Sequence, residues 1–213
     1  MTASAPGALI IACGALAQEI AALRRINRWD ALDIQCLPPE LHNFPKQIPG
    51  RVREAIRAAR DRYSRIFVAY ADCGTGGSLD AVLAEEGVER LPGAHCYEFF
   101  ATAQRFSALA EQEPGTFYLT DFLVRHFDRL VAQTLGIDRH PELIAEYFRN
   151  YRRVVYLIQD QEQSDVQQAA QIAKRLGLEF ETLITGYGDL EPGLRQAATG
   201  PAESPIQWAT WPR

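Results

Sequence analysis

The feature of this sequence that most constrains its fold is an alternation, over the first seventy residues, of short apolar runs with stretches of helical periodicity. The apolar runs are "GALIIACG", "LDIQCL" and "RIFVAYADCG", and the stretches "LAQEIAALRRI" and "RVREAIRAARDRY" separate them. Because an unbroken apolar run suits a strand covered on both faces, this order predicts parallel strands with helices on each side. We therefore expect an α/β fold with a mainly parallel, doubly wound sheet.

The rest of the chain continues the same pattern. A helix is expected over residues 78–86, and a short strand in "VERLPGAHC". Helical spacing recurs over residues 97–112 and 121–151, on either side of "PGTFYLT". The segment that begins "RRVVYLIQD" predicts one more β-α-β unit, similar in layout to the start of the chain.

The length of 213 residues suits one globular domain over residues 1–213, or two lobes that share a cleft. In the second case, the first lobe would span residues 1–113 and the second residues 114–200. Residues 201–213 would then form a tail rich in proline and tryptophan.

Composition excludes some classes of function. The net charge is −5 and the arginines are interspersed with glutamates, so we expect no nucleic-acid partner. The first apolar run stops at Cys13, short of the roughly 20 residues that a membrane span needs, and no basic leader precedes it. We therefore expect a cytoplasmic protein without membrane contact, whose four cysteines are free thiols or metal ligands rather than disulfides.

Cysteines and histidines recur where the expected strands end. Cys13 ends the first strand, His42 follows the second, Cys73 ends the third, and His95 and Cys96 follow the fourth. Parallel strands place their carboxyl ends at one edge of the sheet, which is where open α/β sheets bind ligands. These residues are therefore our candidate metal ligands.

Neighbouring strands lie about 4.8 Å apart. The order of the strands in the sheet therefore decides which of these side chains are close enough to bind one ion. If the order is second, first, third, then Cys13, Cys73 and His42 can reach one ion, and His95 or Cys96 can complete the site. A mixed Cys and His set suits tetrahedral zinc, and an iron–sulfur cluster is the alternative cofactor. Core packing is the competing interpretation for any single cysteine, and it is the one that we adopt for Cys36, within "DIQCLP".

Further residues are expected to line a site at this edge. The segment "CGTGGS" is a candidate cofactor-binding loop through Gly74, Thr75, Gly76 and Gly77, although it has neither P-loop nor GxGxxG spacing. Thr116 is a further candidate binding residue. Glu98 and Tyr118 are the candidate catalytic residues, the first as a general acid or base. Their alternatives are an ordinary helix start for Glu98 and an ordinary strand or loop for "PGTFYLT".

Five stretches resemble an uncharacterised family, the domain of unknown function 1638. They are "IIACGALAQEI", "LPPELHNFP", "VAYADCGTGG", "LPGAHCYEFF" and "GTFYLT", and the resemblance covers most of the chain. It adds to the interpretation of Cys13, His42, Cys73 and Cys96 as ligands. It also implies a link to corrinoid-dependent methyl transfer and one-carbon chemistry. The chain has no Asp-x-His-x-x-Gly corrinoid motif, so we expect no tightly bound cobalamin of its own.

Two functions remain open on the sequence. The first is a metalloenzyme in which zinc activates a thiol, a water molecule or a methyl-transfer substrate of small size. The second is a metal- or cluster-binding accessory protein or chaperone, whose partner is a protein of a methyltransferase system. An open coordination position at the metal would favour the enzyme.

Overall fold

The computed structural model describes residues 7–199, and the chain divides into two compact units. Among the described residues, unit 1 comprises residues 7–96 and 189–199, and unit 2 comprises Tyr97–Gly188. The sequence suggested a division between residues 113 and 114. That point lies inside unit 2, because the helices before it pack on the sheet of unit 2. The expected tail, residues 201–213, lies outside the described residues.

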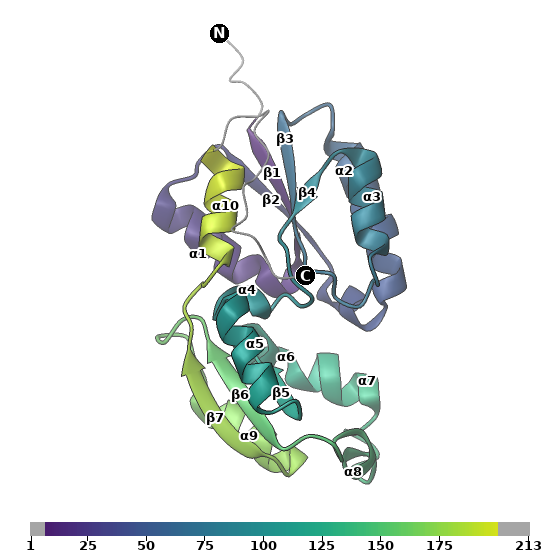
Figure 1. The fold of residues 1–213 in the computed structure, drawn as a ribbon, viewed down its shortest axis with the longest axis vertical. Coiled ribbons are helices and arrows are strands. Elements are labelled where there is room, and N and C mark those ends of the chain that lie inside the picture. The colour runs from purple at the N-terminus through teal and green to yellow at the C-terminus, as the bar shows by residue number, and fades with distance from the viewer. Residues whose placement is uncertain (1–6, 200–213) are drawn as a thin grey trace. The chain divides into compact units, whose positions relative to one another are not determined.

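Unit 1 is built on a parallel sheet whose strands have the order β2-β1-β3-β4 (Figure 1). The strands are β1 (Ala8–Cys13), β2 (Leu32–Leu37), β3 (Arg65–Ala69) and β4 (Glu89–Arg90). The apolar residues of β1 and β3 are buried except at the start of each strand, as expected for central strands. The predicted α/β class with a parallel sheet is confirmed, and the order places the first strand between the second and the third.

Helices cover both faces of this sheet. They are α1 (Ala17–Asn27), α2 (Ile48–Ala59), α3 (Ser78–Glu86) and α10 (Leu190–Thr199), with short 3-10 turns η1 (Gly14–Leu16), η2 (Pro39–Asn43) and η3 (Pro45–Gln47). Helices α1 and α10 lie side by side on one face, while α2 and α3 pack together on the other (Figure 1). Helix α10 is held to α1 by Arg195, which donates a 2.7 Å hydrogen bond to Asn27 and lies over the ring of Trp29.

Unit 2 contains a second parallel sheet, with the order β5-β6-β7. Its strands are β5 (Thr116–Leu119), β6 (Arg153–Ile158) and β7 (Glu179–Ile184). Its helices are α4 (Glu98–Ala101), α5 (Ala103–Gln112), α6 (Asp121–Phe127), the π-helical turn η4 (Asp128–Ala132), α7 (Gln133–Leu135), α8 (Leu143–Tyr147) and α9 (Val166–Leu176). The β-α-β unit that the sequence predicted near the end of the chain is β6, α9 and β7.

The central strand β6 is buried along its whole length because both of its faces are covered. Val154, Tyr156 and Ile158 face a core with residues of α6 and α9. The alternate residues Val155 and Leu157 face Ala101 and Tyr118 on the other side. Each unit is thus a sheet with helices on both faces, as the buried apolar runs predicted.

The carboxyl ends of β5 and β6 are joined by one buried carboxylate. Asp121 accepts a 2.6 Å hydrogen bond from the hydroxyl of Tyr156 and backbone hydrogen bonds from Gln159 and Asp160, at 3.1 and 2.8 Å. Thr120 caps helix α6 by accepting a hydrogen bond from the backbone N–H of Leu123. With its acceptor sites occupied, Asp121 stabilises the fold of unit 2.

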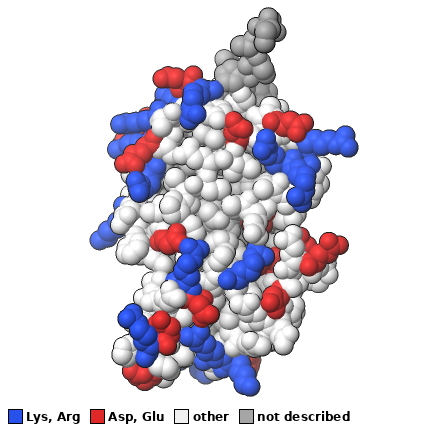
Figure 2. Space-filling view, turned by 180° about the vertical axis from the view of Figure 1, so that it is seen from behind, with Lys and Arg blue, Asp and Glu red and all other residues white. Residues whose placement is uncertain are grey.

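The surface carries charges of both signs. In the face shown in Figure 2, basic and acidic side chains alternate and do not gather by sign. Within residues 7–199, none of the helices combines the length and the apolar character that crossing a bilayer requires.

Candidate metal site

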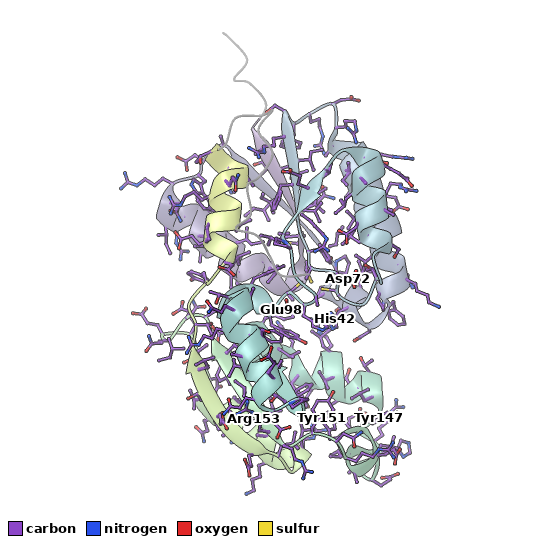
Figure 3. All side chains as sticks on the ribbon, viewed as in Figure 1. His42, Asp72, Glu98, Tyr147, Tyr151 and Arg153 are labelled. Carbon is purple, nitrogen blue, oxygen red and sulfur yellow. The ribbon has the colours of Figure 1, made fainter. Side chains whose placement is uncertain are left out.

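The carboxyl edge of the unit 1 sheet gathers the candidate metal ligands. Cys13 is the last residue of β1, the central strand between β2 and β3. The loop after β2 carries His42 in the turn η2, and Cys73 and Cys96 follow β3 and β4. In Figure 3, His42 and Asp72, the neighbour of Cys73, lie at the same end of this sheet.

These side chains touch one another. The Sγ atoms of Cys73 and Cys96 are 3.3 Å apart. Cys96 also lies within hydrogen-bonding reach of Cys13, and the ring of His42 lies within reach of Cys73. Three thiols and one imidazole, from four segments of the chain, therefore form a continuous group, which we call the thiol cluster.

The position of Cys73 depends on an unusual backbone. Its φ of 49° lies in the left-handed region, which costs a residue other than glycine on the order of 1 kcal/mol. Two hydrogen bonds hold it there, from the N–H of Cys73 to Ala94 and from the N–H of Asp72 to Gly93, at 2.8 and 2.9 Å. These bonds continue the pairing of β3 with β4 and bring Cys73 beside the loop of Cys96.

The loop that carries His42 approaches the end of β1 at Gly14. A Cβ atom at this position would lie 2.8 Å from Pro39 Cδ and 2.9 Å from the carbonyl oxygen of Leu37. Any larger residue would therefore push the His42 loop away from Cys13. His42 itself is exposed, whereas Cys13 and Cys73 are each only 5% exposed, so the imidazole lies on the solvent side of the cluster.

Contacts within the cluster shift the pKa values of its thiols in opposite directions. Hydrogen bonding to Cys96 and to His42 lowers the pKa of Cys73 to about 5, against the effect of burial. Hydrogen bonding to Cys96 also lowers the pKa of Cys13. The pKa of Cys96 is raised, because its S–H is the donor to both neighbours. The partly negative cluster in turn raises the pKa of His42, mainly through its bond to Cys73.

A tyrosine that the sequence did not single out also belongs to this site. Tyr70 follows β3, is 1% exposed, and its hydroxyl has no hydrogen-bond partner of good geometry among the described residues. Burial and then the neighbouring Cys13 raise the pKa of this phenol. A buried hydroxyl normally finds a hydrogen-bond partner. The signal in the sequence that could have identified Tyr70 was a tyrosine at the end of an apolar run, just before a cysteine.

The glycine-rich loop after Cys73 is held by Asp72. The Asp72 carboxylate accepts hydrogen bonds from the Thr75 hydroxyl and from the N–H groups of Gly76 and Gly77, at 2.6, 3.1 and 2.9 Å. Gly74, Gly76 and Gly77 all have positive φ, which explains the choice of glycine. The N–H groups that a phosphate would use at the start of α3 thus already bind a carboxylate.

The other candidate residues are distributed over both units. His95 is partly buried in the unit 1 loop beside Cys96. Thr116, Tyr118 and Glu98 belong to unit 2. Thr116 begins β5 and hydrogen-bonds Glu113 and Arg153, at 2.6 and 3.0 Å.

Tyr118 and Glu98 are both buried. The ring of Tyr118 packs against those of Tyr97 and Phe106, with centroids 5.5 and 4.9 Å away, and these two rings also contact each other. Glu98 opens helix α4. The alternative for Glu98, an ordinary solvated helix start, does not hold, because this carboxyl group is buried.

The expectation that Cys36 belongs to the core is wrong. Cys36 is exposed, because β2 is an edge strand of the sheet and only Leu32 of its six residues is buried. None of the four cysteines is part of a disulfide. Cys36 therefore serves as a natural internal control for the three thiols of the cluster.

The donor atoms of the cluster are packed closely. As they stand, no three Cys, His, Asp or Glu side chains in residues 7–199 form a group spaced to hold a metal ion. In tetrahedral zinc sites two sulfurs lie about 3.8 Å apart, given Zn–S bonds of about 2.3 Å. The Cys73 and Cys96 sulfurs, at 3.3 Å, would have to separate by about half an ångström to reach this geometry.

Comparison with known proteins gives one match. A family model described as "Protein of unknown function (DUF1638)" matches residues 36–194, well over half of the chain. The matched region contains His42, Cys73 and Cys96 and begins after Cys13. No curated protein and no solved structure matches the chain.

Proposed function

The chain belongs to the DUF1638 family of proteins of unknown function, and we propose from the site itself that it binds one soft metal ion, zinc, through Cys13, Cys73, Cys96 and His42. The observation that supports this proposal most strongly is the mutual contact of three thiols and an imidazole at the carboxyl edge of one sheet. Thiolate and imidazole donors together are characteristic of zinc sites.

The chemistry of the donors supports zinc over harder ions. The thiol cluster offers sulfur and nitrogen, whereas magnesium and calcium prefer oxygen ligands. A cysteine binds zinc as its thiolate, so metal binding must displace the thiol protons. The lowered pKa values of Cys73 and Cys13 reduce the cost of this step at neutral pH.

Movement of a few side chains would open the cluster to the ion. Cys96 lies in a partly exposed loop between β4 and α4, and His42 is exposed in a short turn. Both residues can therefore adjust, while Cys13 at the end of a central strand cannot move far. The buried hydroxyl of Tyr70 can donate a hydrogen bond to the thiolate of Cys13, as groups around metal ligands commonly do.

We further propose that the bound ion activates a small substrate in one-carbon, methyl-transfer metabolism, in the reducing cytoplasm. The support is the exposure of His42: replacing this imidazole with a substrate thiol or water would leave three thiolates holding the ion. Zinc keeps a bound thiol or water deprotonated at neutral pH and so turns it into a nucleophile.

The second candidate is an accessory protein with a closed site. The cluster supplies four donors, which is the number that a structural zinc ion needs. If His42 stays bound to the metal when small thiols are added, the result favours this function. In either function, an iron–sulfur cluster held by the three cysteines is the alternative to zinc. Purified protein would then be brown.

The proposed function is tested by metal analysis of protein purified with and without oxygen, followed by zinc titration of the fully reduced chain. We expect one zinc ion per chain, and the same value for the matched control Cys36→Ser. Protein that binds no zinc when reduced, or that contains only iron, would overturn the zinc assignment.

A further inference from the structure

We propose that Cys73 and Cys96 form a reversible oxidation site, in which hydrogen peroxide or another small hydroperoxide joins the two thiols as a disulfide. Their sulfurs are 3.3 Å apart although 23 residues separate them in the chain. The consequence for metal occupancy, described below, rests on the proposed function, whereas the disulfide itself does not.

The backbone already places the two segments side by side. The N–H groups of Asp72 and Cys73 donate hydrogen bonds to Gly93 and Ala94. A disulfide bond is about 2.05 Å long, so the two sulfurs must approach by only about 1.3 Å. The loop of Cys96 is partly exposed, and rotation of its side chain can supply this movement.

The size of the oxidant matters because Cys73 is buried, with 5% of its surface exposed. Hydrogen peroxide is small enough to reach such a thiol, whereas a bulky disulfide is not. The thiolate of Cys73 attacks one peroxide oxygen, the O–O bond breaks, and the departing hydroxide takes up a proton to become water. Cys73 is then a sulfenic acid, oxidised by two electrons.

The second step closes the disulfide. The sulfur of Cys96 attacks the sulfur of the sulfenic acid, the S–O bond breaks, and hydroxide leaves with the proton of Cys96 as a second water molecule. Overall, two thiols and one hydrogen peroxide give one disulfide and two water molecules. A dithiol reductant reverses the change by thiol–disulfide exchange.

When this disulfide forms, the thiol cluster loses two of its candidate metal ligands. Two of its three sulfurs are then no longer thiolates, and only Cys13 and His42 remain as strong donors. Two ligands do not make a zinc site, since structural sites use four and catalytic sites three. Oxidation of this one pair therefore releases the metal ion, and reduction restores the site.

The test is peptide mapping of the metal-free chain after one equivalent of hydrogen peroxide. Trypsin places the four cysteines in separate peptides, because cleavable residues lie between them: Cys73 in residues 66–90, Cys96 in 91–105, Cys13 in 1–24 and Cys36 in 29–46. We expect titratable thiols to fall from four to two and peptide 66–90 to be linked to peptide 91–105.

Variants make the assignment specific. Cys36→Ser should form the same linked peptide in equal yield and Cys13→Ser should still form it, whereas Cys73→Ser and Cys96→Ala should each lose it. Loss of thiols without this link, or a link from peptide 91–105 to peptide 1–24, would overturn the assignment of the pair.

A second arm uses the zinc-loaded chain and a chromogenic zinc chelator. Zinc release in step with the disulfide, reversed by dithiothreitol, supports control of the metal site. Zinc retained after the disulfide has formed would overturn that consequence. A reduced chain that binds no zinc but still forms the disulfide would instead overturn the proposed function and leave the oxidation site in place.

Discussion

Replacing Cys73 with serine is expected to weaken zinc binding at least about a hundredfold, equivalent to roughly 2.7 kcal/mol of binding free energy. Cys73 contacts both Cys96 and His42, so it is the donor that connects the cluster. A serine hydroxyl is close in size to a thiol but is a poor ligand for a soft metal. Competition with a chelator of known zinc affinity measures the change.

The matched control is Cys36→Ser, because Cys36 is exposed on the edge strand β2. Its zinc affinity should stay within about twofold of the wild-type value. Circular dichroism of both variants checks that the fold is retained. Equal zinc affinity in the Cys73→Ser and wild-type chains would remove Cys73 from the ligand set.

Replacing Gly188 with alanine is expected to destabilise unit 2 by about 3 kcal/mol or more. Its φ is +48°, and an added Cβ would lie 2.2 and 2.3 Å from the carbonyl oxygens of Phe99 and Phe100. These are backbone atoms of unit 2, so relief would require helix α4 to move. Urea unfolding followed by circular dichroism measures the loss.

Gly136→Ala is the control for this substitution. Gly136 also belongs to unit 2 and also has a positive φ, of +73°, but nothing lies within 4 Å of an added Cβ. It should lose only about 1 kcal/mol, the cost of the left-handed conformation. Equal losses in the two variants would show that the close approach of Gly188 to α4 does not constrain unit 2.

The order of elements in the first half of the chain could be predicted because its signals are local. Unbroken apolar runs indicated buried parallel strands, and Ser78 indicated the start of α3 to within one residue, since Ser78 is its first helical residue and Gly77 its N-cap. The meeting of Cys13, His42 and Cys73 followed from one further condition, that the first strand lies in the centre. The observed order β2-β1-β3-β4 meets this condition.

The boundary between the two units could not be predicted, because it depends on contacts between distant segments. Helices α4 and α5 pack on β5 and β6, so the boundary falls at Cys96 and Tyr97. Helix α10 returns to the first sheet near the end of the chain, where it packs beside α1. Local periodicity carries no information about which sheet such a helix covers.

The misjudged residues have similar physical causes. Cys36 was expected in the core because its neighbours suit a strand, but the sequence does not say that β2 is an edge strand. Tyr70 was overlooked because a tyrosine at the end of a buried strand is usually a packing residue. Its unpartnered hydroxyl is visible only once the fold places it beside Cys13.

X-ray absorption spectroscopy of the reduced, zinc-loaded chain tests the proposed site most directly, because it counts the atoms bound to the metal. We predict three sulfur neighbours at about 2.3 Å and one nitrogen neighbour at about 2.0 Å. In the His42→Ala variant, the nitrogen neighbour of the metal should be replaced or lost, while all three sulfur neighbours remain. A shell made only of oxygen and nitrogen would contradict the proposal that the thiol cluster binds the metal.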